Sequence, residues 1–189
     1  MAKTVTLPVI SPHLKKVTDS SGQNPEVRRK ESTMHPTKNT LPDNSRKAVI
    51  DLLQQHLAAS LDLASQAKQA HWNVKGSSFV ALHELFDSIH AETLDQADML
   101  AERMVALGGQ TAATVRATAA QTKMPEYPLD ASDQAAHVEA FSGALAHFGG
   151  GVREAIAQAE EIGDAATADL FTEIVRAVDK SLWLVEVHG

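Results

Sequence analysis

One long segment without proline or glycine constrains the fold more than any other feature of this sequence. It lies between Gly76 and Gly108, and both residue types are disfavoured in the interior of a helix. The sequence therefore predicts a single helix over residues 78–107. Ser77 or Ser78 is the expected N-cap, and Gly108 is the expected residue just past the C-terminal end.

Two stripes run along this predicted helix. The first recurs at steps of three and four residues and would face a core: Leu82, Phe86, Ile89, Thr93, Ala97, Leu100, Met104 and Leu107. The second lies about 100° further around the helix and mixes imidazoles with carboxylates: His83, Asp87, His90, Leu94, Asp98 and Glu102. Imidazoles and carboxylates are metal ligands, so the second stripe predicts a metal site, with an ordinary solvated face as the alternative.

The spacing of the second stripe indicates a site shared between subunits. His83 and Asp87 are four residues apart and can share one ion, as can Asp98 and Glu102. The two pairs lie about 16 Å apart along the axis, so one helix cannot bring them together. They are, however, equidistant from the helix midpoint, and a two-fold axis there would set each pair against the opposite pair of a second copy. This arrangement predicts two identical sites per dimer, with His71 as a further ligand from the preceding helix.

Short motifs extend the pattern over roughly residues 45–187. They include His71-Trp72-Asn73-Val74, Gly76, Phe79, Leu82-His83, Phe86-Asp87, Asp98, Ala101-Glu102-Arg103, Leu107-Gly108-Gly109, Tyr127-Pro128-Leu129-Asp130, Val152-Arg153, Thr167-Ala168-Asp169, Asp179-Lys180 and Leu182-Trp183. Together they resemble the Dps family, the DNA-binding proteins from starved cells. The resemblance implies an all-α, ferritin-like four-helix bundle with a short helix in a long crossover, assembled into a hollow dodecamer.

The resemblance also assigns the metal site. It implies two iron ions per inter-subunit site, held by His71, His83 and Asp87 of one subunit and by Asp98 and Glu102 of its two-fold mate. The implied activity is a ferroxidase that oxidises Fe²⁺ with hydrogen peroxide in preference to oxygen, stores the Fe³⁺ mineral and so protects DNA from oxidative damage. Zn²⁺ or manganese could substitute for iron.

Several alternatives stay open at this point. A DNA-compacting protein without enzyme activity, whose metal site is vestigial or holds zinc, is the alternative function. For Trp72, core packing is the expectation and electron transfer beside the iron is a secondary hypothesis. His90 is interpreted as an interface histidine rather than an accessory ligand. No Glu-x-x-His motif occurs at any histidine, which argues against a di-iron centre within one chain.

Charge separates an N-terminal extension, residues 1–43, from the bundle domain predicted over residues 44–189. Residues 1–47 contain nine Lys and Arg against four acids, whereas the rest of the chain carries a net charge of −12. We expect a largely flexible arm whose partner is double-stranded DNA, bound through phosphates without base specificity, or else a solubilising tail. The candidate DNA contacts are Lys3, Lys15, Lys16, Arg28, Arg29, Lys30 and Lys38.

Three further long helices are predicted, over residues 44–73, 132–161 and 165–187, and a short one within residues 111–120. Asp43 or Ser45 is the expected cap of the first. His56 beside its apolar face is interpreted as a buried histidine with its hydrogen bonds satisfied. The helix predicted over residues 132–161 contains Gly149-Gly150-Gly151, which costs roughly 3 kcal/mol of helix propensity and indicates either close helix packing or a kink.

Acidic residues gather around the start of the last helix. The resemblance implies that they line pores at the three-fold axes and guide iron inward, and the alternative is ordinary helix N-terminal charge. The candidates are Glu161, Asp164 and Asp169.

The sequence lacks cysteine, membrane-length apolar runs and a recognisable secretory signal. These features predict a cytoplasmic protein that does not enter a membrane, associated with the nucleoid if it binds DNA.

Overall fold

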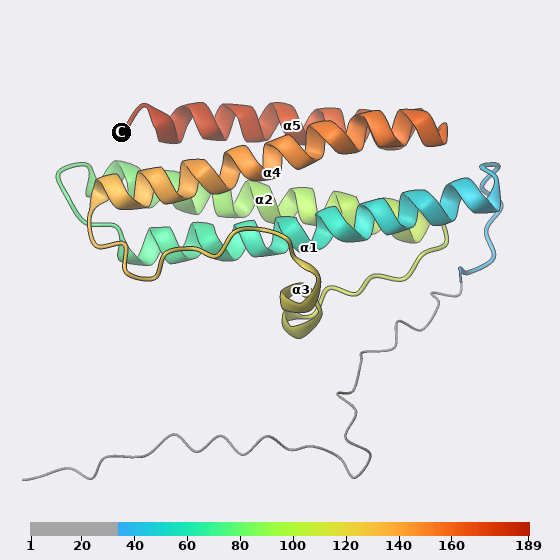
Figure 1. Cartoon of the computed structure of the whole chain (residues 1–189), viewed down its shortest axis with the longest axis horizontal. Helices are drawn as coiled ribbons and strands as arrows, with labels where there is room; N and C mark the ends of the chain where they lie inside the picture. Colours follow the sequence, from blue (N-terminus) through green and yellow to red (C-terminus); the bar gives the residue numbers. More distant parts are fainter. Residues whose placement is uncertain (1–33) are drawn as a thin grey trace, which may run out of the picture. The chain divides into compact units, whose positions relative to one another are not determined.

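The computed structural model describes residues 34–189, which form five helices. They are α1 (Asp43–Asn73), α2 (Phe79–Ala106), α3 (Val115–Gln121), α4 (Gln134–Ile162) and α5 (Ala165–Glu186). The four long helices make a bundle, in which α1 packs chiefly against α2 and α4 against α5 (Figure 1). The ferritin-like four-helix bundle predicted from the sequence is confirmed.

The crossover between α2 and α4 determines the topology of the bundle. It carries α3 along the side of α1 and returns the chain to the end of the bundle where α2 began (Figure 1). As a result α2 and α4 run in the same direction, while α1 and α5 run the opposite way. The short crossover helix is confirmed, and it ends at Gln121, one residue beyond the predicted range of 111–120.

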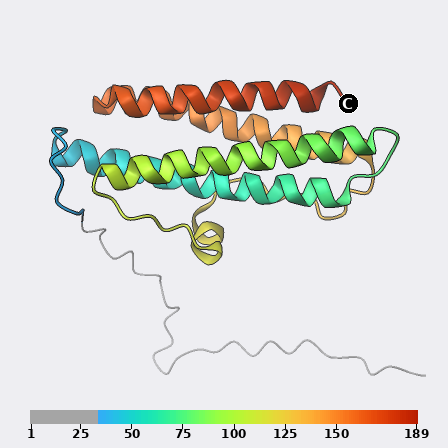
Figure 2. The same cartoon turned by 180° about the vertical axis from the view of Figure 1, so that it is seen from behind.

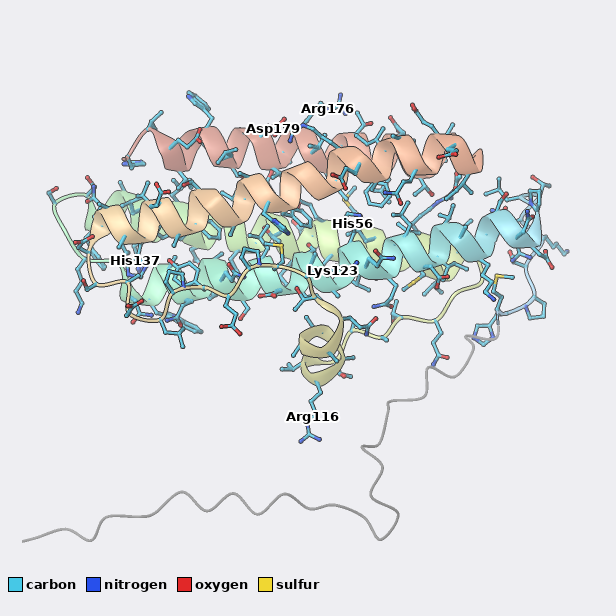
Figure 3. All side chains as sticks on the ribbon, in the orientation of Figure 1. His56, Arg116, Lys123, His137, Arg176 and Asp179 are labelled. Carbon is cyan, nitrogen blue, oxygen red and sulfur yellow. The ribbon has the colours of Figure 1, made fainter. Side chains whose placement is uncertain are left out.

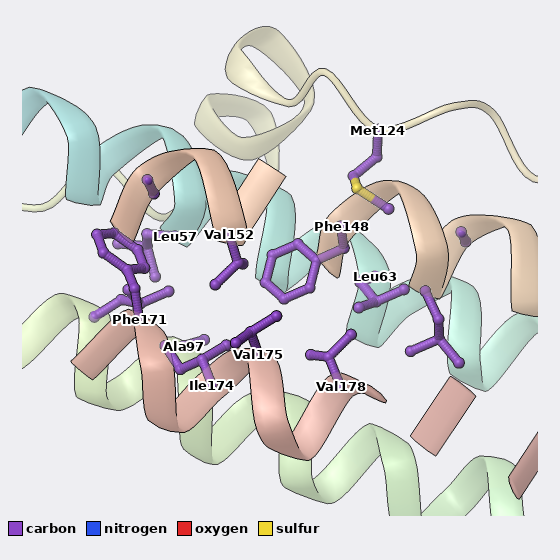
Figure 4. Close-up of a cluster of buried hydrophobic side chains, with 14 of the residues drawn as sticks. Leu57, Leu63, Ala97, Met124, Phe148, Val152, Phe171, Ile174, Val175 and Val178 are labelled. Atoms are coloured by element: carbon purple, nitrogen blue, oxygen red, sulfur yellow. The ribbon is translucent and has the colours of Figure 1, made fainter. Parts of the chain in front are cut away.

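The apolar stripe predicted on α2 forms the middle of the core, because all eight of its members are buried. Leu57 of α1, Phe148 and Val152 of α4, and Phe171 and Ile174 of α5 meet in the same interior (Figure 4). The view from behind shows α2 lying along the bundle beside α5 and α1 (Figure 2). The titratable stripe of α2, which is turned away from this core, is therefore left at the surface of the protomer.

The structure differs from two expectations about the helix caps. No side chain caps α1, which begins directly after Pro42, so neither Asp43 nor Ser45 has the predicted role. Ser78 does occupy the N-cap position of α2, but its side chain makes no capping hydrogen bond. By contrast, Asp133 accepts a hydrogen bond from the Ala136 amide at 2.9 Å, which is the usual N-cap interaction.

Gly108 ends α2 as predicted, with a φ of +91° that favours glycine. Its carbonyl accepts a hydrogen bond from the His35 amide at 2.7 Å, so the segment before α1 is attached to the end of α2. A Cβ at Gly108 would lie 2.6 Å from the His35 carbonyl oxygen. Met34 and Leu41 also pack against the core, so residues near both ends of the segment 34–42 contact the bundle. The flexibility expected of the extension as a whole stays a prediction.

The three consecutive glycines do not interrupt α4. A Cβ at Gly149 would lie 3.3 Å from Val178 Cγ1, so close packing against α5 explains this glycine. No atom lies within 4 Å of a Cβ at Gly150. Of the two expectations for this run, close packing holds at Gly149 only.

Among residues 34–189, no helix is long and apolar enough to cross a membrane. The division at residue 43 between the extension and the bundle domain stays a prediction.

Candidate metal centre on the outer face of α2

The five predicted ligands come from two helices. His71 lies in the last turn of α1, and the other four lie on α2. His71 is buried, His83 is half-buried, and the three carboxylates are exposed. The titratable stripe therefore remains accessible in a single protomer.

His71 and His83 hold each other in place. His71 Nδ1 lies 2.7 Å from the His83 carbonyl oxygen, and His83 Nδ1 lies 2.9 Å from the His71 carbonyl oxygen. Each Nδ1 must donate a proton to its carbonyl, so each Nε2 is left with a lone pair, as a metal ligand requires. The rings are stacked, with their centroids 3.6 Å apart. These two reciprocal contacts between α1 and α2 thus fix both imidazoles in the tautomer that can bind a metal.

Asp87, one turn further along α2, forms an ion pair with Lys68 of α1. The hydrogen bond from the Lys68 ammonium holds the pKa of the Asp87 carboxyl below its ordinary value. Asp87 is therefore an anion at neutral pH, paired with a cation that an incoming metal ion would have to replace. Lys68 was not singled out from the sequence, although its position one turn before His71 places it on the same side of α1.

Asp98 and Glu102 lie on the exposed second half of α2. Within residues 34–189 of a single protomer, no three His, Asp or Glu side chains converge closely enough to hold a metal ion. One protomer therefore brings His71 and His83 together and places Asp87 one turn further along α2, but it does not gather these three side chains into a closed site or join them to the second carboxylate pair. The assignment of all five as ligands stays a prediction.

Exposed apolar side chains lie near this stripe, and the exposure of one of them, Trp72, differs from what the sequence predicts. The sequence favours core packing for Trp72, but 69% of it is exposed. Leu94, on the titratable stripe near the midpoint of α2, is 41% exposed, and Phe79 is 42% exposed. Phe79 also contacts the His83 ring, with centroids 5.0 Å apart. Exposed aromatic and aliphatic groups of this size beside polar ligands are typical of an interface.

His90 makes the same type of contact as His71 and His83, from Nδ1 to a backbone carbonyl. Its Nδ1 lies 2.9 Å from the Ala64 carbonyl oxygen, a contact that ties α2 to α1. Its role, as an interface residue or an accessory ligand, stays a prediction.

One of the three pore candidates is not available to a pore. Asp164 is only 3% exposed and accepts two hydrogen bonds from Arg103 Nη2, at 2.9 and 2.8 Å. It is also the N-cap of α5 and accepts a hydrogen bond from the Thr167 amide. The prediction that Asp164 lines a pore is wrong, because its carboxylate is used inside the protomer. Glu161 and Asp169 are exposed, and their pore role stays a prediction.

Two histidines, one half-buried and one buried, have environments that the sequence did not indicate. His56 is half-buried rather than buried, and its buried Nδ1 has no hydrogen-bond partner, so the expectation of a buried histidine with its hydrogen bonds satisfied is wrong. His137 Nδ1 lies 2.7 Å from the Tyr127 hydroxyl, and burial raises the pKa of that tyrosine. His56 lies midway along the bundle and His137 near the start of α4 (Figure 3).

Only one of the candidate DNA contacts lies in the part of the chain that the structure describes. It is Lys38, which is exposed. The others lie outside the described residues: Lys3, Lys15, Lys16, Arg28, Arg29 and Lys30.

Comparison with known proteins agrees with this fold. A ferritin-like domain model matches residues 50–188. The DNA protection during starvation protein of Agrobacterium fabrum is 42% identical over 154 residues, covering 82% of this chain and 95% of that protein.

Solved structures with the same fold include DpsA14 from Streptomyces coelicolor, which is 33% identical with a TM-score of 0.78 and covers 83% of this chain and 93% of that one. The structure of Dps from Microbacterium arborescens in the high iron form is 33% identical with a TM-score of 0.72, covering 78% of this chain and 95% of that one. A matching domain over most of the sequence, together with a relative of this similarity, places the chain in the Dps family of ferritin-like proteins.

Proposed function

We propose that this protein oxidises Fe²⁺ at sites shared between two copies of the chain and stores the Fe³⁺ product. The observation that carries the proposal is the His71–His83 pair, whose Nδ1 atoms are both occupied by backbone carbonyls and whose Nε2 atoms are free. Asp87 lies one turn along the same stripe, and Asp98 and Glu102 are exposed at the mirror-related positions. Mixed imidazole and carboxylate ligands suit Fe²⁺, and carboxylates stabilise Fe³⁺.

The proposed reaction requires two iron ions per site. Two Fe²⁺ each give one electron to one hydrogen peroxide, which takes up two protons and leaves as two waters, without release of hydroxyl radical. His71, His83 and Asp87 would bind from one subunit, and Asp98 and Glu102 from its mate. Lys68 would give up its contact with Asp87 when a metal ion arrives, because both cations compete for the same carboxylate oxygen.

The dimer proposed here has an apolar surface available to it. Trp72, Phe79 and Leu94 are exposed beside the ligand stripe and would be removed from water by a second copy. Beyond the dimer, we propose a dodecameric shell in which Glu161 and Asp169 attract iron towards the interior. The Agrobacterium fabrum relative is named for DNA protection during starvation, and the Microbacterium arborescens Dps was solved in a high iron form.

Stopped-flow oxidation of Fe²⁺ by hydrogen peroxide tests this proposal. The variant combines Asp98→Ala with Glu102→Ala, and its matched control combines Glu84→Ala with Asp95→Ala. All four residues are exposed acids of α2, so the two variants lose the same charge. We expect the rate to fall at least about a hundredfold in the first variant, because loss of ligands or their supports costs affinity or activity on this scale, and to stay near wild type in the control. Equal rates in all three proteins would contradict the shared site.

The zinc-holding or vestigial alternative makes a different prediction in the same assay. A site that binds Zn²⁺ without turnover would show no peroxide-dependent oxidation in the wild type, and metal analysis of the isolated protein would find zinc rather than iron.

We further propose that the basic N-terminal extension binds DNA through its phosphates. Residues 1–47 carry a net charge of +5 and residues 48–189 a net charge of −12, and this contrast supports the second function. Deletion of residues 1–33 should abolish the retardation of duplex DNA on a gel, and wild-type binding should weaken steeply between about 50 and 200 mM salt. Retention of binding after the deletion would contradict the assignment. The proposed location is the cytoplasm, at the nucleoid when DNA is bound.

A further inference from the structure

A cavity of about 480 Å³ lies between α1, α4 and the segment that follows α3, away from the titratable stripe of α2. Its volume is in the range of sites that bind small molecules. Leu52, Ala59 and Phe148 give it an apolar lining, while Gln55, Lys123 and Glu154 supply polar groups. Figure 3 shows His56 and Lys123 on the same side of the bundle, where the crossover passes α1 and α4.

His56 contributes an imidazole with unused hydrogen-bonding capacity to this cavity. The ring packs edge-on against Phe171, with centroids 5.0 Å apart. Nδ1 is buried without a partner, which leaves Nε2 as the ring nitrogen available to a ligand. Burial lowers the pKa of His56 to about 4, so the imidazole is uncharged at neutral pH. Imidazoles with unmet hydrogen bonds are unusual in protein interiors and require an explanation.

Two glycines of α4 keep the same cavity open. Packing explains Gly149, but no atom lies within 4 Å of a Cβ at Gly150. A Cβ at Gly151 would meet only His56 Cε1, at an ordinary contact distance of 3.6 Å. Both positions could therefore take a residue with a better helix propensity, and both line the cavity. Larger side chains there would fill it, so the glycines maintain the space at the expense of helix stability.

We propose that this cavity binds a small, planar, uncharged aromatic molecule that carries a hydroxyl or N–H group and hydrogen-bonds to His56. Glycine backbone exposes a flat surface against which a ring can lie, since no side chain projects from it. A charged group is disfavoured beside His56 because the inner part of the cavity is lined by buried Leu52 and Phe148, which offer it no solvation. Lys123 and Glu154 carry opposite charges, so together they do not favour an ion of either sign. This proposal does not depend on the iron site.

Saturation-transfer NMR on the intact assembly tests the proposal, with phenol as the probe and benzoate as its charged counterpart. We expect transfer to phenol at millimolar concentration and at least about tenfold weaker binding of benzoate, since a ring polar group that reaches His56 lies beside buried Leu52 and Phe148, where a carboxylate is costly. No transfer to phenol in the wild type, or equal binding of phenol and benzoate, would overturn the proposal.

Variants locate the binding. Gly150→Leu should fill the cavity and abolish phenol binding, while Gly143→Leu is the matched control. Gly143 lies on the same helix, also has no atom within 4 Å of a Cβ, and does not line the cavity. His56→Phe should weaken phenol about tenfold through loss of one hydrogen bond and leave toluene unaffected. Unchanged phenol binding in Gly150→Leu, or an equal loss in Gly143→Leu, would contradict this location.

Discussion

Removal of the Asp164 carboxylate should destabilise the bundle more than any other single change to an acid of α5. Asp164 lies between α4 and α5, 3% exposed, and accepts hydrogen bonds from the Arg103 guanidinium of α2 and from Thr167. It therefore acts both as the N-cap of α5 and as a tie between α2 and α5. Asp164→Asn retains a capping oxygen but loses the charge, whereas Asp164→Ala loses both.

The two substitutions allow the free-energy contributions of the charge and of the cap to be measured separately. Loss of the charge-assisted contact with Arg103 should cost about 2 kcal/mol, because Arg103 is itself partly exposed and its charge can be solvated. Loss of the cap should add about 1 kcal/mol. We therefore expect the free energy of unfolding to fall by about 2 kcal/mol in Asp164→Asn and about 3 kcal/mol in Asp164→Ala.

The same contact predicts a pH dependence. Burial alone would raise the pKa of Asp164, but the hydrogen bonds from Thr167 and Arg103 outweigh it and place the pKa below 3.8. A carboxyl whose pKa is lower in the folded state stabilises above its unfolded pKa, and this stability disappears as pH falls through the folded value. The stability difference between wild type and Asp164→Asn should therefore shrink below about pH 4.

Guanidinium denaturation followed by circular dichroism measures these values at one fixed protomer concentration, since assembly contributes to apparent stability. Asp169→Ala is the control, because Asp169 is an exposed acid of the same helix. If Asp164→Ala and Asp169→Ala unfold within about 0.5 kcal/mol of each other, the stabilising role of this buried contact is refuted.

Two further predictions concern single residues of the bundle. Gly108→Ala should lower the free energy of unfolding by about 2 kcal/mol, because the φ of this residue is +91° and the new Cβ would lie 2.6 Å from the His35 carbonyl oxygen. Guanidinium denaturation measures this loss, and a change in the free energy of unfolding below about 0.5 kcal/mol would contradict the prediction. The pKa of His56 is lowered to about 4, so the free energy of unfolding should fall as pH drops from 6.5 to 4. His56→Phe should remove up to about 3 kcal/mol of that fall, and an identical pH profile in this variant would refute the assignment.

The helical spacing of the apolar residues made the four-helix bundle predictable from the sequence. Each long helix carries an apolar face at helical spacing, and on α2 that face is buried in full. The caps were less predictable because a capping bond depends on the direction from which the chain enters the helix. Ser78 has the residue type and the position of a cap, yet its backbone, with φ −99° and ψ 21°, does not present the hydroxyl to the first turn.

In the candidate site, too, features set by spacing along one helix were predictable, whereas contacts between segments far apart in the sequence were not. The stripe of His83, Asp87, Asp98 and Glu102 follows from spacing along one helix. The environment of Asp164 depends on Arg103, 61 residues earlier, which no local pattern indicates. The exposure of Trp72 was not predictable, because residue type alone cannot distinguish a side chain buried in its own protomer from one left exposed for a second copy.

The central claim is that each iron site takes ligands from two chains, and complementation between two inactive variants tests it most directly. One variant carries His83→Ala with Asp87→Ala, the other Asp98→Ala with Glu102→Ala, and the two are co-expressed with different affinity tags so that mixed assemblies can be isolated. In a mixed dimer one site regains all five ligands and the other keeps only His71. Random pairing should therefore restore about a quarter of the wild-type rate of peroxide-dependent Fe²⁺ oxidation. Mixed assemblies as inactive as either parent would contradict the shared site.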